Sequence, residues 1–190
     1  MKEIRIHARA GQGAITTARI LAMAAFEQGM YALAFPHFGA ERMGAPMNAF
    51  VRIDRNKIYL RSRVHAPDYI LVVDPTLVES QEFGVFDGLK DDGTAIINHA
   101  GDTAKLATMT KAKICTVPAS EISMEILGQD RPNMVILGAF AASTGEIEFP
   151  SLEKAIIANF GKGTVATKNV QAARKAFDLV TGGSLTGSAK

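Results

Sequence analysis

The chain has 190 residues, of which 47% are hydrophobic and 21% are charged, a composition that fits one folded domain and excludes a chain that is disordered throughout. Its formal net charge of +2 is smaller than the basic excess that marks nucleic-acid-binding proteins. No segment approaches the roughly 18 uninterrupted apolar residues that span a bilayer, and the first residues lack a secretory apolar region. We therefore expect a cytoplasmic protein with neither a membrane nor a nucleic acid as partner.

The first strand and helix are predicted from hydrophobic periodicity. Residues 4–8 alternate as in a β-strand, residues 9–13 form a glycine-containing turn, and residues 14–28 have the apolar spacing of a helix. An apolar run at 31–35 then leads into a segment at 36–46 that contains two glycines and two prolines. We expect this irregular segment at the surface or at an interface.

The next stretch predicts a β-hairpin. Apolar residues alternate with polar ones at 51–53 and at 58–60, and the turn-like residues 54–57 separate the two runs. Such a hairpin would have one apolar and one charged face. The hairpin region is locally basic, with cationic side chains at Arg52, Arg55, Lys57, Arg61 and Arg63.

The remainder alternates between covered strands and helices. Uninterrupted β-branched runs predict central parallel strands at 69–73, 94–98 and 114–117. Helices are predicted at 102–109, 120–127, 133–143, 151–160 and 170–180. This order favours an α/β fold, a three-layer α/β/α Rossmann-like domain with a mixed, mostly parallel sheet and an antiparallel hairpin. We expect one domain over residues 1–180 and a flexible or partner-contacting tail over 181–190.

Cysteine usage limits the metal chemistry. Cys115 is the only cysteine, whereas an iron–sulfur cluster needs about four thiolates and a structural zinc site needs four Cys or His ligands. The four histidines are scattered without ligand spacing. We therefore expect no metal site in this chain, and we predict that Cys115 is a core residue of a buried strand.

The turn at Gly11, Gln12 and Gly13 suits an anion, because backbone N–H groups and the positive end of a helix dipole meet there. It lacks the Lys-Ser/Thr ending of a nucleoside-triphosphate loop, and no acidic residue stands about 20 residues further on to hold a ribose. Autonomous NTP or NAD binding is therefore excluded. The alternative is purely steric, since tight strand-to-helix turns need glycine in any case.

Two segments stand out together, the runs RAGQGA at 9–14 and PHFGAERMGAP at 36–46. As a pair they resemble the gamma subunit of pyruvate:ferredoxin oxidoreductases, the 2-oxoacid:acceptor oxidoreductase family. The resemblance continues over nearly the whole chain. It departs from the family pattern at Ala8 and Ala10, where glycines are usual, and at Met43, where arginine is frequent.

The resemblance implies a thiamine-diphosphate-dependent enzyme that oxidatively decarboxylates pyruvate or a related 2-oxoacid and transfers the acyl group to coenzyme A. Thiamine diphosphate and the [4Fe-4S] clusters would lie in alpha, beta and delta-type partner subunits, with ferredoxin or a similar acceptor. This chain would be a non-catalytic subunit that binds no cofactor alone, covers the active site and shares coenzyme A at an interface. Phenylglyoxylate, branched-chain 2-oxoacids and 2-oxoglutarate are alternative substrates.

The candidate cofactor-binding residues are Gly11, Gln12, Gly13, Arg42 and Asn98. Arg42 either reaches a phosphate or pairs with Glu41. Asn98 and Asp74 follow covered strands, where α/β sheets bind ligands, or they cap the following turns. The basic hairpin residues either attract coenzyme A phosphates or an acidic partner surface, or they form a solvated face.

No Ser/His/Asp or Cys/His set is visible, so no catalytic residue is assigned. A stand-alone α/β module that binds an anionic metabolite is the alternative function.

Overall fold

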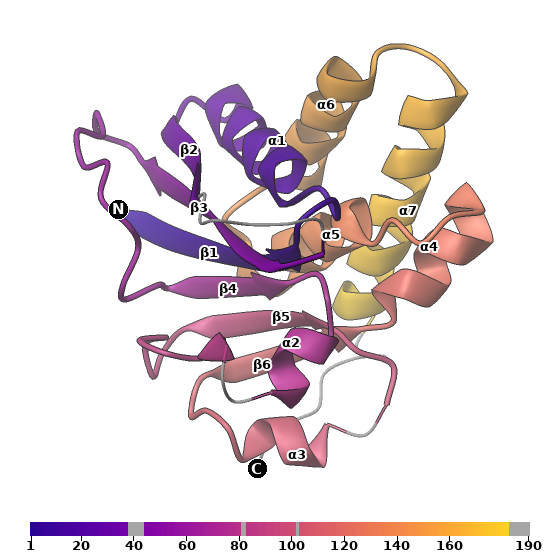
Figure 1. The fold of residues 1–190 in the computed structure, drawn as a ribbon. Helices are drawn as coiled ribbons and strands as arrows, with labels where there is room; N and C mark the ends of the chain where they lie inside the picture. The colour runs from indigo at the N-terminus through magenta and orange to yellow at the C-terminus, as the bar shows by residue number, and fades with distance from the viewer. Residues whose placement is uncertain (38–43, 81–82, 102, 183–190) are drawn as a thin grey trace.

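The computed structural model describes residues 1–37, 44–80, 83–101 and 103–182. In these residues one six-stranded sheet has the order β2-β3-β1-β4-β5-β6 (Figure 1). Strands β1, β4, β5 and β6 are parallel, whereas β3 runs antiparallel to both of its neighbours, β1 and β2. The strands are β1 Lys2–Arg9, β2 Tyr31–His37, β3 Pro46–Asp54, β4 Tyr69–Val72, β5 Thr94–Asn98 and β6 Lys113–Val117.

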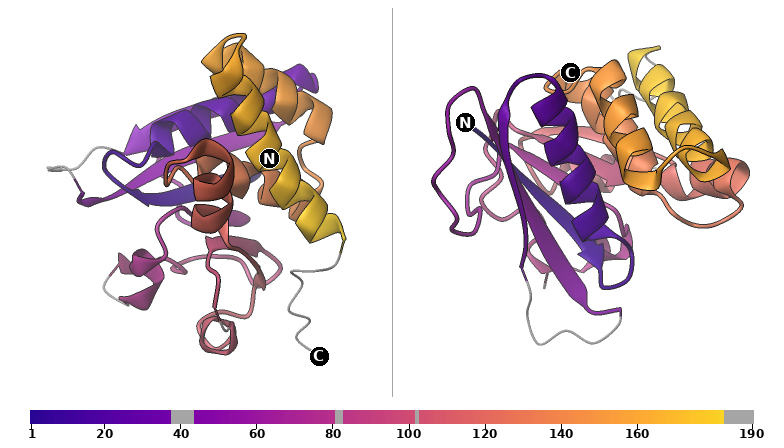
Figure 2. Two further views of the ribbon diagram at one scale, coloured as in Figure 1. Left: turned by 90° about the vertical axis from the view of Figure 1, so that its right-hand side faces the viewer. Right: turned by 90° about the horizontal axis from the view of Figure 1, so that it is seen from above.

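Helices cover both faces of the sheet. The described helices are α1 Ala14–Glu27, α2 Thr76–Glu79, α3 Ala104–Ala107, α4 Ala119–Leu127, α5 Asn133–Thr144, α6 Phe149–Phe160 and α7 Thr164–Thr181. Residues of α1 and α4 to α7 share one hydrophobic cluster with one face of the sheet, and α2 and α3 share a second cluster with the other face. Figure 2 shows α1, α6 and α7 on the same side of the sheet. The predicted three-layer α/β/α fold is confirmed.

The central strands are buried on both faces, as their uninterrupted apolar sequences predict. In β4, Leu71 belongs to the first cluster while Ile70 and Val72 belong to the second. In β5, Ile96 likewise faces the first cluster. Alternate residues of a strand point to opposite faces, so a strand between two helical layers needs apolar residues at every position.

The predicted hairpin between 51–53 and 58–60 is wrong. Strand β3 pairs with β2 on one edge, where Ile53 lies opposite Ala32, and with β1 on the other, where Ile53 lies opposite Lys2. Both edges of β3 are therefore occupied, and residues 55–68 leave the sheet without forming a strand. The antiparallel hairpin of the fold is β2–β3, and its connection contains residues 38–43, which lie outside the described residues.

Arg52 is also not on a solvated face, because its side chain is only 1% exposed. Nε of Arg52 lies 2.7 Å from Oε1 of Glu3, so the buried guanidinium has an opposite charge beside it. The alternation of charged and apolar residues in this strand is therefore not a division between solvent and core.

Other boundaries differ by less. Helix α7 begins at Thr164 rather than at 170, and the short helix α2 was not predicted. Cys115 is buried, which confirms its predicted place in the core, and burial raises the pKa of its thiol. The predicted tail from 181 begins inside α7, and residues 183–190 lie outside the described residues. Among the described residues, no helix is both long and apolar enough to span a bilayer.

Helix α5 lies at the centre of the helical layer, and residues 133–141 are buried all round. Its close contact with α7 depends on Gly138. A Cβ at this position would overlap the carbonyl oxygen of Ala173, a backbone atom that cannot move aside.

We expect Gly138→Ala to lower the free energy of unfolding by about 3 kcal/mol, because the added methyl must separate two packed helices. The control is Gly145→Ala just after the end of the same helix, where φ is 67° and the added Cβ would have no contact within 4 Å beyond its chain neighbours. It should cost only about 1–2 kcal/mol of left-handed strain. Urea denaturation of both variants measures the difference, and equal losses would contradict the close approach of α5 and α7.

Candidate functional site

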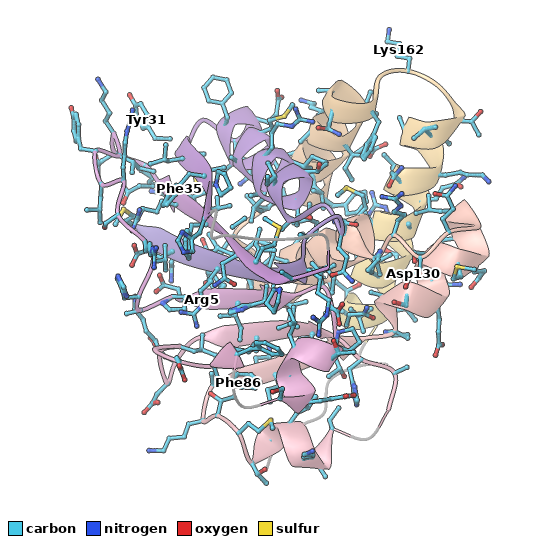
Figure 3. All side chains as sticks on the ribbon, in the orientation of Figure 1. Arg5, Tyr31, Phe35, Phe86, Asp130 and Lys162 are labelled. Atoms are coloured by element: carbon cyan, nitrogen blue, oxygen red, sulfur yellow. The ribbon has the colours of Figure 1, made fainter. Side chains whose placement is uncertain are left out.

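The predicted site residues meet at the carboxyl edge of the parallel strands. Gly11 and Gln12 follow β1, Asp74 follows β4, and Asn98 ends β5; all four line one cavity of about 420 Å³. Residues of the connection between α4 and α5 also line the cavity, and Figure 3 shows Asp130 of that connection beside α4. After β1 the chain turns toward β2, whereas β4 leads to β5 on the other side. This is the reversal of strand order at which open α/β sheets bind ligands.

The two segments that carry the family resemblance are joined by hydrogen bonds. The N–H of Ala10 donates to the carbonyl of Ala45 at 2.8 Å, and the N–H of Gly44 donates to the carbonyl of Ala10 at 3.1 Å. The Arg9 guanidinium adds a bond to the carbonyl of Gly44 at 3.2 Å. No described non-glycine residue has a positive φ, so the alanines at 8 and 10 are compatible with the backbone of this turn. Arg42, the remaining predicted site residue, lies outside the described residues.

The Gln12 side chain connects the glycine turn to β4. Its Oε1 accepts a hydrogen bond from the N–H of Arg9 at 2.7 Å, and its Nε2 donates to Oδ2 of Asp74 at 2.6 Å. The N–H of Gln12 donates to the carbonyl of Arg9 at 3.0 Å. These bonds occupy the amide, so a direct contact between this side chain and a ligand stays a prediction, and its visible role is to position the turn.

Asp74 is held in its charged form. Burial alone would raise the pKa of this carboxyl, but hydrogen bonds from Thr76 and Gln12 and the charge of Arg9 outweigh burial and lower the pKa below its ordinary value. Nε of Arg9 lies 3.3 Å from Oδ2, and both the N–H and the hydroxyl of Thr76 donate to Oδ1, at 2.9 and 2.6 Å. The cavity wall therefore contains a carboxylate whose negative charge is paired with the Arg9 guanidinium.

Asn98 forms the floor of the cavity. Its Nδ2 donates to the carbonyl of Val73 and to the Ser120 hydroxyl, both at 2.9 Å, while its Oδ1 accepts from the N–H of Ser120 at 3.1 Å. The side chain thus ties the end of β5 to β4 and to the start of α4. This arrangement agrees with the capping alternative, and a contact between Asn98 and a cofactor stays a prediction.

Gly13 and Asn133 form the contact that sequence reasoning missed. Nδ2 of Asn133, at the start of α5, donates to the carbonyl of Gln12 at 2.7 Å and to the hydroxyl of Thr17 at 3.0 Å. Gly13 has a φ of 81°, and a Cβ there would lie 2.8 Å from that Nδ2. Both the backbone angle and the space therefore require glycine. The only signal in the sequence was the asparagine directly after Pro132, and asparagine is common near the start of helices, so it did not indicate this contact.

The turn leaves donors available to a ligand. The N–H groups of Gly11 and Gly13 form no hydrogen bond with a described residue. Gly13 also borders a second cavity of about 310 Å³, whose apolar lining is formed by Leu127, Met134, Phe160 and Val165. Two cations stand at these cavities: Arg131 lines both, and Lys168 lines the second. Free N–H groups at a helix start beside cations can hold an anionic group.

No group of three or more His, Cys, Asp or Glu side chains placed to hold a metal ion occurs in the part of the chain that the structure describes. The donors of this site are amide and cationic nitrogen atoms, which suit phosphate or carboxylate oxygen.

Gly13→Ala is expected to destabilise the protein by about 3 kcal/mol, since left-handed strain adds to the displacement of Asn133 and the loss of its hydrogen bonds. Gly29→Ala, just after the other end of α1, is the matched control, because its φ is 76° and no atom lies within 4 Å. It should cost about 1–2 kcal/mol. Thermal unfolding followed by circular dichroism compares them, and similar losses would exclude the steric role of Asn133.

The Asp74 carboxylate gives a pH-dependent prediction. Its folded pKa lies below the unfolded value of about 3.9, so its contribution to stability is complete above that value and is lost as the pH falls through the folded pKa. We expect Asp74→Asn to cost about 1–3 kcal/mol at pH 7 and less at pH 3. Urea denaturation at both pH values measures this, with Asp91→Asn on an exposed loop as control. A loss that does not shrink at pH 3 would contradict the assignment.

Comparison with known proteins agrees with this geometry. The family model described as pyruvate ferredoxin/flavodoxin oxidoreductase matches residues 3–179. The pyruvate synthase subunit PorC of Methanosarcina barkeri is 51% identical over 82% of this chain and 85% of its own length. The pyruvate/ketoisovalerate oxidoreductases common subunit gamma of Pyrococcus furiosus is 43% identical over 94% of this chain and 96% of its own.

Solved structures share the fold. The pyruvate oxidoreductase subunit PORC of Thermotoga maritima superposes with a TM-score of 0.82 at 37% identity, over 93% of this chain and 95% of that one. The 2-oxoglutarate:ferredoxin oxidoreductase of Magnetococcus marinus, solved with 2-oxoglutarate, coenzyme A and succinyl-CoA bound, matches with a TM-score of 0.77 at 21% identity, over 96% of this chain and 31% of that one. By its matched length and identity, the chain belongs to the pyruvate ferredoxin/flavodoxin oxidoreductase family, as the gamma-type subunit of a multi-subunit 2-oxoacid oxidoreductase.

Proposed function

We propose that this chain holds part of coenzyme A at the carboxyl edge of β1, β4 and β5 and covers the active site of its partner subunits. The observation that carries this proposal is the glycine turn, where the N–H groups of Gly11 and Gly13 form no hydrogen bond with a described residue and each glycine borders a cavity that Arg131 also lines. Such a site is complementary to the phosphate groups of coenzyme A.

The dimensions favour a shared site. The cavity of about 420 Å³ lies toward the small end of the range of about 300–1,000 Å³ for ligand pockets, while coenzyme A is larger than most ligands of that class. Part of the cofactor would therefore contact another subunit. Asp74 and Gln12 would act as supports that keep the turn in place, and their bonds to each other leave the anion-facing donors unobstructed.

The decarboxylation chemistry is proposed to belong to the partner chains, of alpha, beta and delta type. Thiamine diphosphate and the [4Fe-4S] clusters would lie there, with ferredoxin as electron acceptor. The single cysteine supports this division, since Cys115 is buried in the core and one thiol cannot ligate a four-iron cluster. The part of this chain in the reaction would then be to orient the acyl acceptor and exclude water.

Pyruvate is the proposed substrate of the complex. Two similar proteins are named for pyruvate, and a third is named as a subunit common to pyruvate and ketoisovalerate oxidoreductases. A gamma subunit that serves two 2-oxoacids supports a substrate pocket in other subunits. We therefore expect substitutions at the glycine turn to affect coenzyme A rather than the 2-oxoacid.

Arg131→Ala tests the site in the assembled enzyme, with electron transfer to a viologen dye as the assay. We expect the KM for coenzyme A to rise about tenfold or more, because one charge-assisted contact is worth about 1.5–3 kcal/mol, while the KM for pyruvate stays unchanged. Lys162→Ala, on the connection between α6 and α7, is the control (Figure 3). An unchanged KM for coenzyme A would refute this placement of the cofactor.

A further inference from the structure

The connection between β3 and β4 forms a second surface, at the opposite edge of the sheet. We call residues 55–63 the basic loop. Ile53 pairs with Lys2 and Tyr69 pairs with Ile4, so the connection starts and ends at the amino end of β1. In Figure 1 this loop lies on the left beside the N-terminus, whereas the cavity residue Asp130 lies on the right in Figure 3. The basic loop is therefore separate from the proposed coenzyme A site.

The basic loop has no strand or helix, yet hydrogen bonds from the buried Arg52 side chain fix its backbone. The Arg52 guanidinium donates hydrogen bonds to the carbonyl groups of Leu60 at 3.1 Å, Ser62 at 2.7 Å and Arg63 at 3.4 Å. The ion pair with Glu3 and the Phe35 ring, whose centroid lies 5.5 Å from Cζ, hold the guanidinium itself. A loop fixed in this way loses little conformational entropy when a partner binds.

The charges of the basic loop are uncompensated. Residues 55–67 include four cationic and no acidic side chains. None of the four forms an ion pair with a described residue, and they are Arg55, Lys57, Arg61 and Arg63. The nearest acidic residues along the chain are already engaged: Asp54 pairs with the N-terminal amino group at 2.6 Å and Asp68 with Lys90 at 2.7 Å. The loop thus presents about four positive charges that an acidic surface would complement.

Apolar side chains stand between these cations. Tyr59 is 77% exposed, the largest exposed fraction of any large hydrophobic residue in the described part of the chain, and Leu60 is 48% exposed. An aromatic and an aliphatic side chain between arginines are typical of the centre of a protein interface. A nucleic acid would favour successive aromatic side chains for base stacking, and the loop contains one aromatic residue.

We propose that the basic loop docks onto an acidic surface of another subunit of the same oxidoreductase. Tyr59 and Leu60 would be buried at the centre of the contact, and the four cations would face carboxylates around it. With coenzyme A at the other edge of the sheet, the chain would contact partner subunits through two separate surfaces. This inference requires the multi-subunit enzyme but does not depend on where coenzyme A binds.

The test uses the complete enzyme, co-expressed with an affinity tag on this chain. The variant is Arg61→Glu with Arg63→Glu, and the control with the same change in charge is Lys111→Glu with Lys162→Glu, two exposed lysines that form no ion pair with a described residue. We expect the loop variant to retain at least tenfold less of the other subunits at 150 mM NaCl, while the control retains wild-type amounts. Retention by the wild type should fall as salt rises, because salt screens exposed charges. Melting curves of the tagged chain establish that each variant is folded.

A second measurement tests the proposal even if charge reversal disturbs folding. A photo-crosslinking phenylalanine analogue at position 59 of the otherwise unchanged chain should crosslink to an acidic peptide of another subunit. Two results would overturn the proposal: wild-type retention and salt dependence in the folded double variant, or no crosslink to another subunit in the assembled enzyme. Loss of heparin binding by the double variant with intact assembly would indicate a polyanion as the true partner.

Discussion

The candidate site depends on the contact between the Asn133 amide and the glycine turn. Helix α5 is buried all round, so its first residue is fixed by the core. From that position Nδ2 holds the carbonyl of Gln12 and the hydroxyl of Thr17, which sets the turn and the first turn of α1 together. Because Gly13 has no side chain, the amide can come close enough to do this. The free N–H groups of the turn owe their direction to this contact, and it connects core packing to the proposed binding of an anion.

The antiparallel strand β3 separates the glycine turn from the basic loop, which lie at opposite ends of the strands. In a purely parallel sheet, the chain returns through a crossover, usually a helix, after every strand. Strand β3 instead lies between β1 and β2 and is antiparallel to both, so the loop that follows it begins at the amino end of β1. The glycine turn thus lies at one edge of the sheet and the basic loop at the other. A subunit that is to contact a cofactor and a second partner chain benefits from this separation, because neither surface has to change shape for the other.

Two buried arginines on one face of the sheet hold irregular segments of the chain by hydrogen bonds to their carbonyl groups. On β1, Arg5 donates to the carbonyl groups of Val85 at 3.1 Å and Asp87 at 2.6 Å, while on β3 Arg52 binds three carbonyl groups of the basic loop. A guanidinium has five donors in a fixed plane, so one side chain can hold a loop that lacks secondary structure. His7 is part of the same arrangement: burial and the charge of Arg5 lower its pKa to about 3, and the neutral ring accepts a hydrogen bond from Nε of Arg5 at 2.9 Å.

Hydrophobic periodicity in the sequence was enough to determine β1, the glycine turn, α1 and the covered strands, because each of these depends on residues that are close along the chain. It was also enough to place Gly11, Gln12 and Asn98 at the carboxyl edge, since parallel strands end there together. Only the tertiary structure decided that β3 pairs with β2 and β1, that Arg52 is buried, and that Gln12 binds Asp74 while Asn133 fixes Gly13. The hydrogen bonds of Arg52 with Glu3, of Gln12 with Asp74 and of Asn133 with Gln12 join residues 49 to 121 positions apart in the sequence. A local pattern specifies which face of an element is apolar, but the partner of each polar group depends on how distant elements pack.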